Sequence, residues 1–317
     1  MEQLNKFVSS RGLLRSCDVH NENPISSSAD LGPSLPSLHS ALKPHSSIYV
    51  CTDALERFAL EIAPTIRTEY TLVSGDSDLK VDKHLLSRPG IAALVESKYL
   101  KFWYAQNLAV RHERLANLPI GLDYHTAWEK PGQWNIARQS PFAQELSLES
   151  ILQESKPIEK RFGLAYCNWH FSIKHGDRRH CMDVIDKNLC FFEAHKLPRR
   201  ATWQRQSEFI FTISPEGIGL DCHRTWESLL LGSIPIVKRS PICSLFEQLP
   251  VLVIDDWREV TKPLLESFVN DALKRPYNFS KLFLNYWQQK IRGNRFREPL
   301  NLMGLNAFRN LMWINRN

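Results

Sequence analysis

The stretch EFIFTISPEGIGLDCHRTWESLLLGSIPIVK, residues 208–238, strongly limits the folds available to this chain. Its flanks, EFIFTIS and SIPIV, are short apolar runs of the kind that form buried parallel strands. Between them PEGIG interrupts the first strand, Asp221 is placed to cap a helix, and Gly232 is placed to end it. The pattern predicts strand, tight loop, helix, turn and strand, which is the repeating unit of a doubly wound α/β domain.

The predicted helix has one packed face and one polar edge. The packed face is expected from four residues at helical spacing: Cys222, Trp226, Leu229 and Leu230. The polar edge holds His223, Arg224 and Glu227, which lie within one turn of each other. Glu227 suits the two hydroxyls of a ribose, because a carboxylate accepts several hydrogen bonds. The alternative is an ordinary surface ion pair between Arg224 and Glu227, worth less than about 1 kcal/mol.

The loop before this helix is a candidate anion site. A glycine-bearing loop that leads into a helix N-terminus offers free N–H groups and the positive end of the helix dipole. With His223 and Arg224 beside it, such a loop suits a diphosphate. We therefore expect the loop contacts of a bound donor to come from Ser214, Gly217 and Gly219.

This stretch, continued by SPICSLFEQLPVLVIDDWREVT, resembles the donor-binding segment of exostosin-like glycosyltransferases. The resemblance is dense over residues 208–262 and weaker over 68–125, where LVSGDSD, KFWYAQN and LPIGLDYHT resemble N-domain segments of related sequences. It implies the GT-B architecture, with two Rossmann-like α/β domains facing a cleft and a nucleotide sugar held by the C-terminal one. It further implies a hexosyl- or pentosyltransferase of polysaccharide biosynthesis that inverts the anomeric carbon.

Length and composition agree with a two-domain globular protein. The 317 residues allow two domains of roughly 150 residues each, and 43% of them are hydrophobic. A net charge of +6 suits an anionic donor, whereas the spread of Lys and Arg among 34 acidic residues is unlike the concentrated basic stripe of a nucleic-acid binder. Seven cysteines without regular spacing predict reduced thiols, with no disulfide framework and no zinc site.

The chain divides into three expected parts. Residues 1–46 form a partly irregular extension, rich in Ser and Pro over 21–46. Residues 47–157 form an acceptor-side domain, and residues 158–317 form the nucleotide-sugar-binding domain with a helical tail, which by resemblance crosses back to the first domain. Further expected strands lie at 47–52, 69–75, 160–168, 190–198 and 251–255, and 114–126 is expected to be a strand that leads into a polar loop with Asp123, Tyr124 and His125. Further helices are expected at 54–63 capped by Asp53, 140–156, 201–207, 240–249, 256–274 interrupted by Pro263, and 278–293.

No segment of the sequence predicts membrane insertion. The first twenty residues lack the continuous apolar core of a signal peptide, and no stretch approaches about 18 apolar residues. Many exostosin-like enzymes carry an N-terminal anchor. Its absence here favours a soluble cytoplasmic enzyme, or a shortened form of an anchored one.

Four residues of the first domain are candidates for the base that deprotonates the acceptor. Asp76 and Asp78 follow a predicted strand and rank first, ahead of Asp123 and His125, because α/β sheets bind ligands at the C-terminal ends of their strands. The alternative is that each of them only caps a turn. The Asp76-Ser77-Asp78 triplet could hold Mg²⁺ or Mn²⁺. It lies far from the donor-binding segment in the sequence, so we expect no metal and no cofactor.

Basic residues of the second domain are candidates for stabilising the leaving diphosphate. Asn168 ends a predicted strand and is expected to contact the sugar or the backbone. The following loop and helix offer Lys174, Arg178 and Arg179, and Lys238 follows the strand SIPIV. The alternative is a solvated basic loop. Together with Arg224, these cations would make a divalent ion unnecessary.

The sequence thus predicts a glycosyltransferase that moves a sugar from a UDP- or GDP-type donor to a hydroxyl of a glycan acceptor. An alternative is a non-catalytic glycan- or nucleotide-binding protein on the same scaffold. A nicotinamide-dependent dehydrogenase is disfavoured, because PEGIGLDC has only two of the required glycines and lies late in the chain.

Overall fold

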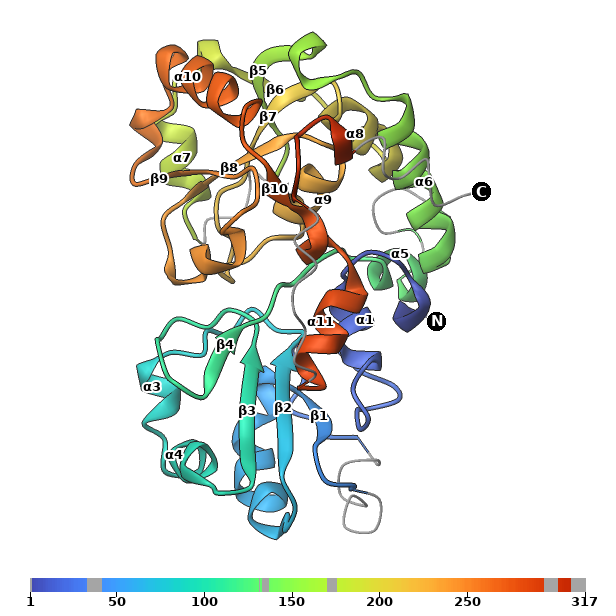
Figure 1. Cartoon of the computed structure of the whole chain (residues 1–317), viewed down its shortest axis with the longest axis vertical. Coiled ribbons are helices and arrows are strands. Elements are labelled where there is room, and N and C mark those ends of the chain that lie inside the picture. Colours follow the sequence, from blue (N-terminus) through green and yellow to red (C-terminus); the bar gives the residue numbers. More distant parts are fainter. Residues whose placement is uncertain are drawn as a thin grey trace.

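The structure is a computed structural model that describes residues 2–32, 42–130, 132, 137–169, 176–293 and 302–308. Two parallel sheets dominate it, one above the other in Figure 1. The first has the order β1-β2-β3-β4, with bounds Ser46–Cys51, Tyr70–Gly75, Leu100–Ala105 and Leu115–Asn117. The second has the order β6-β5-β7-β8-β9, with β5 Phe162–Cys167, β6 Cys190–Phe192, β7 Phe209–Ile213, β8 Ile234–Lys238 and β9 Leu252–Ile254. The expected α/β fold with two Rossmann-like sheets is confirmed.

Helices connect these strands. The α-helices are α1 Ser10–Arg15, α2 Leu55–Arg57, α3 Lys83–Leu86, α4 Pro89–Glu96, α5 His125–Glu129, α6 Pro141–Glu154, α7 Arg178–Val184, α8 Arg199–Gln206, α9 His223–Leu230, α10 Lys262–Ala272 and α11 Leu284–Ile291. Short 3-10 segments occur at Glu2–Leu4, Thr52–Ala54, Ala63–Thr65, Ile158–Lys160, Lys187–Leu189, Pro241–Phe246, Trp257–Glu259 and Phe279–Leu282, and a π-helical segment at Phe58–Ile62. Helix α6 packs against α8, so this part of residues 47–157 lies beside the second sheet.

The stretch 208–238 folds as strand, loop, helix and strand, as predicted. Strands β7 and β8 pair in parallel, with Phe211 opposite Ile234, and Trp226, Leu229 and Leu230 of α9 are buried. Gly232 follows the helix with φ +70°, a left-handed conformation that favours glycine. The prediction that Asp221 caps this helix was wrong, however. Cys222 occupies the N-cap position, and the Asp221 carboxylate accepts hydrogen bonds from the Ile120 N–H and the Trp226 indole N–H.

Three further helix predictions were wrong in detail. The segment expected as one helix over 54–63 begins at Thr52 and changes from 3-10 to α to π geometry, so Asp53 lies inside its first turn and does not cap it. The segment 240–249 forms a 3-10 helix at Pro241–Phe246. Pro263 lies in the first turn of α10 and does not interrupt a longer helix, which fits its missing N–H.

The beginning of the chain packs between the two sheets against its last long helix. Helix α1 lies beside α11 in Figure 1. The Val8 N–H donates to the Leu282 carbonyl at 2.9 Å, and the Leu284 N–H donates to the Lys6 carbonyl at 2.9 Å. The Tyr104 hydroxyl at the end of the first sheet donates to the Lys290 carbonyl at 3.1 Å. Helix α11 therefore joins the segment 6–9 and the first sheet.

The described part of the tail returns to the second sheet. Strand β11 (Leu302–Met303) pairs with β10 (Tyr277–Asn278) in an antiparallel arrangement, and the Ile158 N–H donates to Asn306 Oδ1 at 3.2 Å. The tail expected to cross to the first domain comprised residues 297–317, and its described part, residues 302–308, contacts the part of the molecule built on the second sheet instead. The other tail residues lie outside the described ranges.

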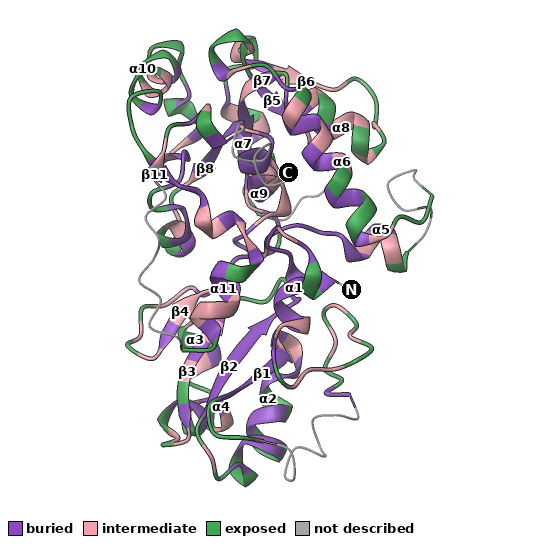
Figure 2. Cartoon of the chain, turned by 45° about the vertical axis from the view of Figure 1, so that its right-hand side comes forward, coloured by how far each residue is buried: buried purple, intermediate pink, exposed green. Residues whose placement is uncertain are grey.

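Both faces of the first sheet are covered, and Figure 2 shows its strands β1 and β2 as buried. Ile48, Val50 and Leu72 face one hydrophobic cluster with α2 and α4, while Tyr49 and Val73 face another that includes Phe7 and Leu13. This second cluster continues into the core of the second sheet. Among the helices that the structure describes, none is long and apolar enough to cross a membrane.

Candidate functional site

We call the part of the molecule built on the sheet β1–β4 the first half and the part built on the sheet β5–β9 the second half. A pocket of about 620 Å³ lies between these two halves. This volume is in the usual range of small-ligand sites. Asp78, Ile120 and Asp123 line it from the first half, after strands β2 and β4. Asn168, Glu193 and Gly217 follow β5, β6 and β7 and line it from the second half. The pocket therefore lies where the C-terminal ends of both parallel sheets converge.

The structure brings most of the predicted site residues together at this pocket. Nine of them line it: Asp78, Asp123, Asn168, Arg178, Gly217, Gly219, His223, Arg224 and Glu227. Five lie beyond its lining: Asp76, His125, Arg179, Ser214 and Lys238. Lys174 lies outside the described residues.

Arg224 is held in the pocket wall by its neighbours. Its Nε donates to the Asn168 carbonyl at 2.9 Å, and its Nη1 lies 3.4 Å from Ser214 Oγ. Its guanidinium carbon lies 5.8 Å from the centre of the Trp169 ring. Burial lowers the pKa of Arg224, but a guanidinium stays charged at neutral pH. Ser214 does not line the pocket itself, but it helps to hold the Arg224 side chain that does.

Arg178, at the start of α7, is half-buried and lines the pocket with two guanidinium nitrogens that have no partner in the described part of the chain. Its Nε and Nη1 atoms are buried and have no hydrogen-bond partner among the residues the structure describes. A Cβ added to Gly217 would lie 3.0 Å from Arg178 Nη2, so the glycine gives the guanidinium room. A buried charge without a partner is costly, and an anion in the pocket would compensate it.

Glu227 lies one turn into α9 and pairs with a residue that the sequence did not indicate. Its Oε1 lies 3.2 Å from Nη2 of Arg199, which is the first residue of α8. The Arg199 Nη1 donates to Gln144 Oε1 at 3.1 Å. The ion pair of Glu227 is thus formed with Arg199 and not with Arg224, the partner considered from the sequence. Arg199 also lines the pocket.

Arg179 and Lys238 point to other partners. Arg179 is exposed on α7 and lies 3.9 Å from Asp183. Lys238 Nζ lies 3.4 Å from Asp177 Oδ1, beside a much smaller cavity that Ser214 and Glu216 also line. Neither cation is available at the main pocket in this structure.

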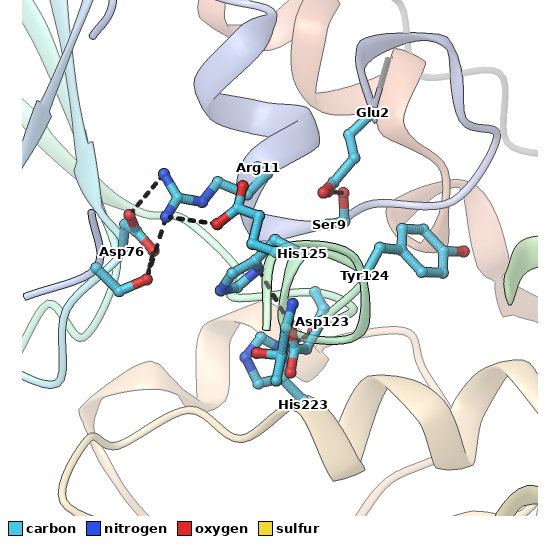
Figure 3. Close-up of polar contacts among 12 residues, drawn as sticks. Glu2, Ser9, Arg11, Asp76, Asp123, Tyr124, His125 and His223 are labelled. Atoms are coloured by element: carbon cyan, nitrogen blue, oxygen red, sulfur yellow. Dashed lines mark hydrogen bonds and ion pairs between the residues drawn. The ribbon is translucent and has the colours of Figure 1, made fainter. Parts of the chain in front are cut away.

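Asp76, ranked first as a base from the sequence, is held in an ion pair away from the pocket lining. Its Oδ2 lies 3.1 Å from Arg11 Nη1, and Ser26 Oγ donates to its Oδ1 at 2.8 Å (Figure 3). Its backbone has φ +56°. Burial raises the pKa of Asp76, and Arg11 opposes that rise. The carboxylate thus ties β2 to the N-terminal segment.

Asp123 lines the pocket, and His125 lies behind it. The His125 Nδ1 is 3.1 Å from Asp123 Oδ1, which also accepts from the Thr126 N–H at 2.9 Å. Burial lowers the pKa of His125 to about 4, so its imidazole is neutral at neutral pH. Burial alone would raise the pKa of Asp123, but His125 and Arg199 hold it below its usual range. Asp123 is therefore an ionised carboxylate at the pocket wall.

Asn107 and Asp221 join the two halves beside the pocket, and sequence reasoning missed both roles. Asn107, with φ +52°, follows β3, and its Oδ1 accepts from the N–H groups of Leu220 and Asp221 at 2.9 and 3.0 Å. Asp221 Oδ2 accepts from the Ile120 N–H at 2.8 Å. A Cβ on Gly219 would lie 3.0 Å from Asn107 Nδ2. Two amides at the end of the predicted anion loop therefore bind Asn107 and are not available to an anion in the pocket.

Comparisons with known proteins give only distant similarities. No protein-family model matches the sequence, and no curated protein is significantly similar to it. Among solved structures, HepE of Anabaena in complex with UDP has a TM-score of 0.38 at 11% identity, over 89% of this chain and 80% of that chain. Apo OtsA has a TM-score of 0.35 at 11% identity, and the match covers 88% of this chain and 74% of that chain. A trehalose-6-phosphate synthase, from work on glycosyltransfer with retention, has a TM-score of 0.33 at 11% identity, and the match covers 88% of this chain and 75% of that chain. These values are too low to transfer the role of any residue.

Among the residues that the structure describes, no group of three or more His, Cys, Asp and Glu side chains is arranged to hold a metal ion. The seven cysteines are all free thiols. The pocket lining combines guanidinium, imidazole and carboxylate groups with the polar side chains of Lys196, Asn168, Gln206, Thr202 and Thr212.

Glu2 is a buried carboxyl near this site and makes stability depend on pH. Burial raises its pKa from 4.5 to about 7, although Ser9 Oγ donates to it at 2.9 Å (Figure 3). Because the folded pKa is raised, the stabilisation is present below pH 4.5 and is lost as pH rises through 7.

We expect Glu2→Gln to remove this dependence of the free energy of unfolding on pH and to stabilise the protein at pH 8 by up to about 3 kcal/mol. Urea denaturation of the parent and the variant from pH 4.5 to 8 measures the free energy of unfolding at each pH. Glu22→Gln, at an exposed position, is the control, and equal slopes in the two variants would contradict the assignment.

Proposed function

We propose that this protein is a glycosyltransferase that moves a sugar from a nucleoside diphosphate sugar to a hydroxyl of a glycan acceptor. The observation that carries the proposal is Arg178, which lines a pocket between two parallel α/β sheets and has two buried, unpaired guanidinium nitrogens among the described residues. Arg224 lines the same pocket at the beginning of α9. These two guanidinium groups match the charge and the hydrogen-bonding pattern of a diphosphate.

The remaining groups of the pocket suit the other parts of such a donor. Glu227 is oriented by Arg199 and offers carboxylate oxygens to the hydroxyls of a ribose. Residues 158–317 then bind the donor, and the acceptor enters from the side of Asp78 and Asp123, within residues 47–157. In the transfer, the acceptor oxygen bonds to the anomeric carbon. The bond from that carbon to the diphosphate breaks, and its electrons leave with the diphosphate, where Arg178 and Arg224 stabilise the charge.

The finer features of the reaction follow from the resemblance to exostosin-like enzymes. We propose transfer with inversion, because a single displacement needs only one base. We also propose that no divalent ion is required, because Arg178 and Arg224 supply the positive charge. Proton NMR of the product linkage tests the first point. Activity after extensive treatment with EDTA, with and without added Mg²⁺ or Mn²⁺, tests the second.

Titration calorimetry with UDP, GDP, CMP and dTDP tests the function itself. We expect UDP or GDP to bind, and Glu227→Gln to weaken that binding about tenfold, because an amide makes weaker hydrogen bonds to hydroxyls than a carboxylate does. Glu208→Gln, at an exposed position far from the pocket lining, should leave the affinity unchanged. Binding without transfer to any glycan would indicate a nucleotide-binding protein, and absence of binding by all four nucleotides would contradict the proposal.

A further inference from the structure

His223 is the first residue of α9 and reaches across the pocket to the other half of the molecule. Its Nδ1 lies 2.7 Å from the Gly121 carbonyl oxygen. A carbonyl oxygen only accepts hydrogen bonds, so Nδ1 carries the hydrogen in this contact. In the neutral imidazole, Nε2 then holds a lone pair. The contact with Gly121 therefore selects the tautomer whose Nε2 can accept a proton.

The Gly121 carbonyl is held in a fixed position. Gly121 has φ +63°, and a Cβ at this position would lie 2.5 Å from the Val8 carbonyl oxygen. The next residue, Leu122, donates its N–H to the Val8 carbonyl at 2.9 Å, and its own carbonyl accepts from the Ser10 N–H at 3.3 Å. The N-terminal segment thus fixes the backbone that orients the imidazole.

Carboxyl groups share the pocket wall with His223. Asp123 and Asp221 line the same pocket, one from each half of the molecule. His223 and Asp123 both line the pocket, and Figure 3 shows the two side chains.

Three of the four candidate bases named from the sequence are less suited, whereas Asp78 lines the pocket and stays a candidate beside His223. Asp76 is paired with Arg11, and His125 is buried beyond the pocket lining. The lowered pKa of Asp123 makes it a weak base at neutral pH.

We propose that His223 Nε2 accepts the proton of the acceptor hydroxyl during sugar transfer, with Asp123 stabilising the imidazolium. This inference rests on the proposed glycosyltransferase function. As the acceptor oxygen bonds to the anomeric carbon, its proton passes to Nε2, and the bond to the diphosphate breaks with its electrons on the leaving group. The imidazolium then returns the proton to solvent.

Replacement of His223 by Asn provides the test. The amide nitrogen of His223→Asn takes the place of Nδ1 and keeps the donor to Gly121, but the variant has no group at Nε2. We expect the transfer rate, measured as nucleoside diphosphate release from UDP- and GDP-hexoses with a glycan acceptor, to fall at least 100-fold. We expect the affinity for UDP or GDP to stay within twofold, and the acidic limb of the pH–rate profile to disappear. His84→Asn, at an exposed position on α3, is the control and should match the parent.

The alternative results are distinct. If His223→Asn loses nucleotide affinity by the same factor as the transfer rate, His223 is a donor contact and the inference is overturned. Nitrogen NMR of histidine-labelled protein should show the Nδ1–H tautomer at His223, and the Nε2–H tautomer would also overturn it without any substrate. If the parent protein binds neither UDP nor GDP, the proposed function fails and this inference fails with it.

Discussion

Arg178→Gln is expected to lower the affinity for UDP or GDP at least 100-fold and, at the same time, to stabilise the ligand-free protein by about 1 kcal/mol. The two effects have one cause. Two nitrogens of the Arg178 guanidinium are buried and unpaired among the described residues, so we expect the side chain to destabilise the ligand-free protein and to bind an anion strongly. Calorimetry with UDP and GDP measures the first effect, and urea denaturation without ligand measures the second.

The adjacent residue is a matched control for this experiment. Arg179 has the same chemistry one position further along α7, but its side chain is exposed and lies 3.9 Å from Asp183. Arg179→Gln should leave the affinity unchanged and alter the free energy of unfolding by no more than about 0.5 kcal/mol. The reverse result, with affinity lost in Arg179→Gln and kept in Arg178→Gln, would show that the anion binds on the outer face of α7.

Asn107→Gly is expected to lower the free energy of unfolding by about 2–3 kcal/mol. The substitution leaves the buried N–H groups of Leu220 and Asp221 without an acceptor and the Ser77 carbonyl without the donor at 2.9 Å. Glycine tolerates the φ of +52°, so this variant isolates the side-chain bonds. Asn107→Ala should lower the free energy of unfolding by about 1 kcal/mol more than Asn107→Gly does, because the alanine Cβ disfavours the left-handed conformation.

Asn117 offers a control on the same edge of the first sheet. Its Nδ2 donates to Ser244 Oγ at 3.1 Å, also across the two halves, but at a more exposed position. Asn117→Ala should therefore cost less than about 1 kcal/mol. Urea denaturation followed by tryptophan fluorescence and by circular dichroism measures both variants. Equal losses at Asn107 and Asn117 would show that burial does not distinguish these two connections.

The parts of the fold that depend on near neighbours in the sequence were predictable. The segment 208–238 carries its own apolar strands, glycines and helical face, and it folds as expected. Helix α6 begins after Ser140, whose side chain accepts from the Ala143 N–H, with Pro141 in the first turn. Each of these features requires only residues within one or two turns of the chain.

The features that depend on distant partners were not predictable. Asp76 looks like a free carboxylate until Arg11, 65 positions earlier, is placed beside it. Glu227 is paired with Arg199, 28 positions away, rather than with its neighbour on the helix. Asp221 was expected to cap α9, but its oxygens accept from Ile120 and from the Trp226 indole, because these contacts satisfy a fully buried carboxylate. No periodicity or motif in a single sequence indicates such pairings.

The pairing of residues 6–9 with residues 282–284 affects how the protein is made. A nascent chain emerges from the ribosome N-terminus first, so the segment 6–9 must wait until residues 282–291 have been made. Until then, Phe7, Leu13 and Leu14 lack the partners that bury them from the C-terminal side. The first sheet can form early, but the junction that presents Gly121 to His223 closes only after α11 has emerged.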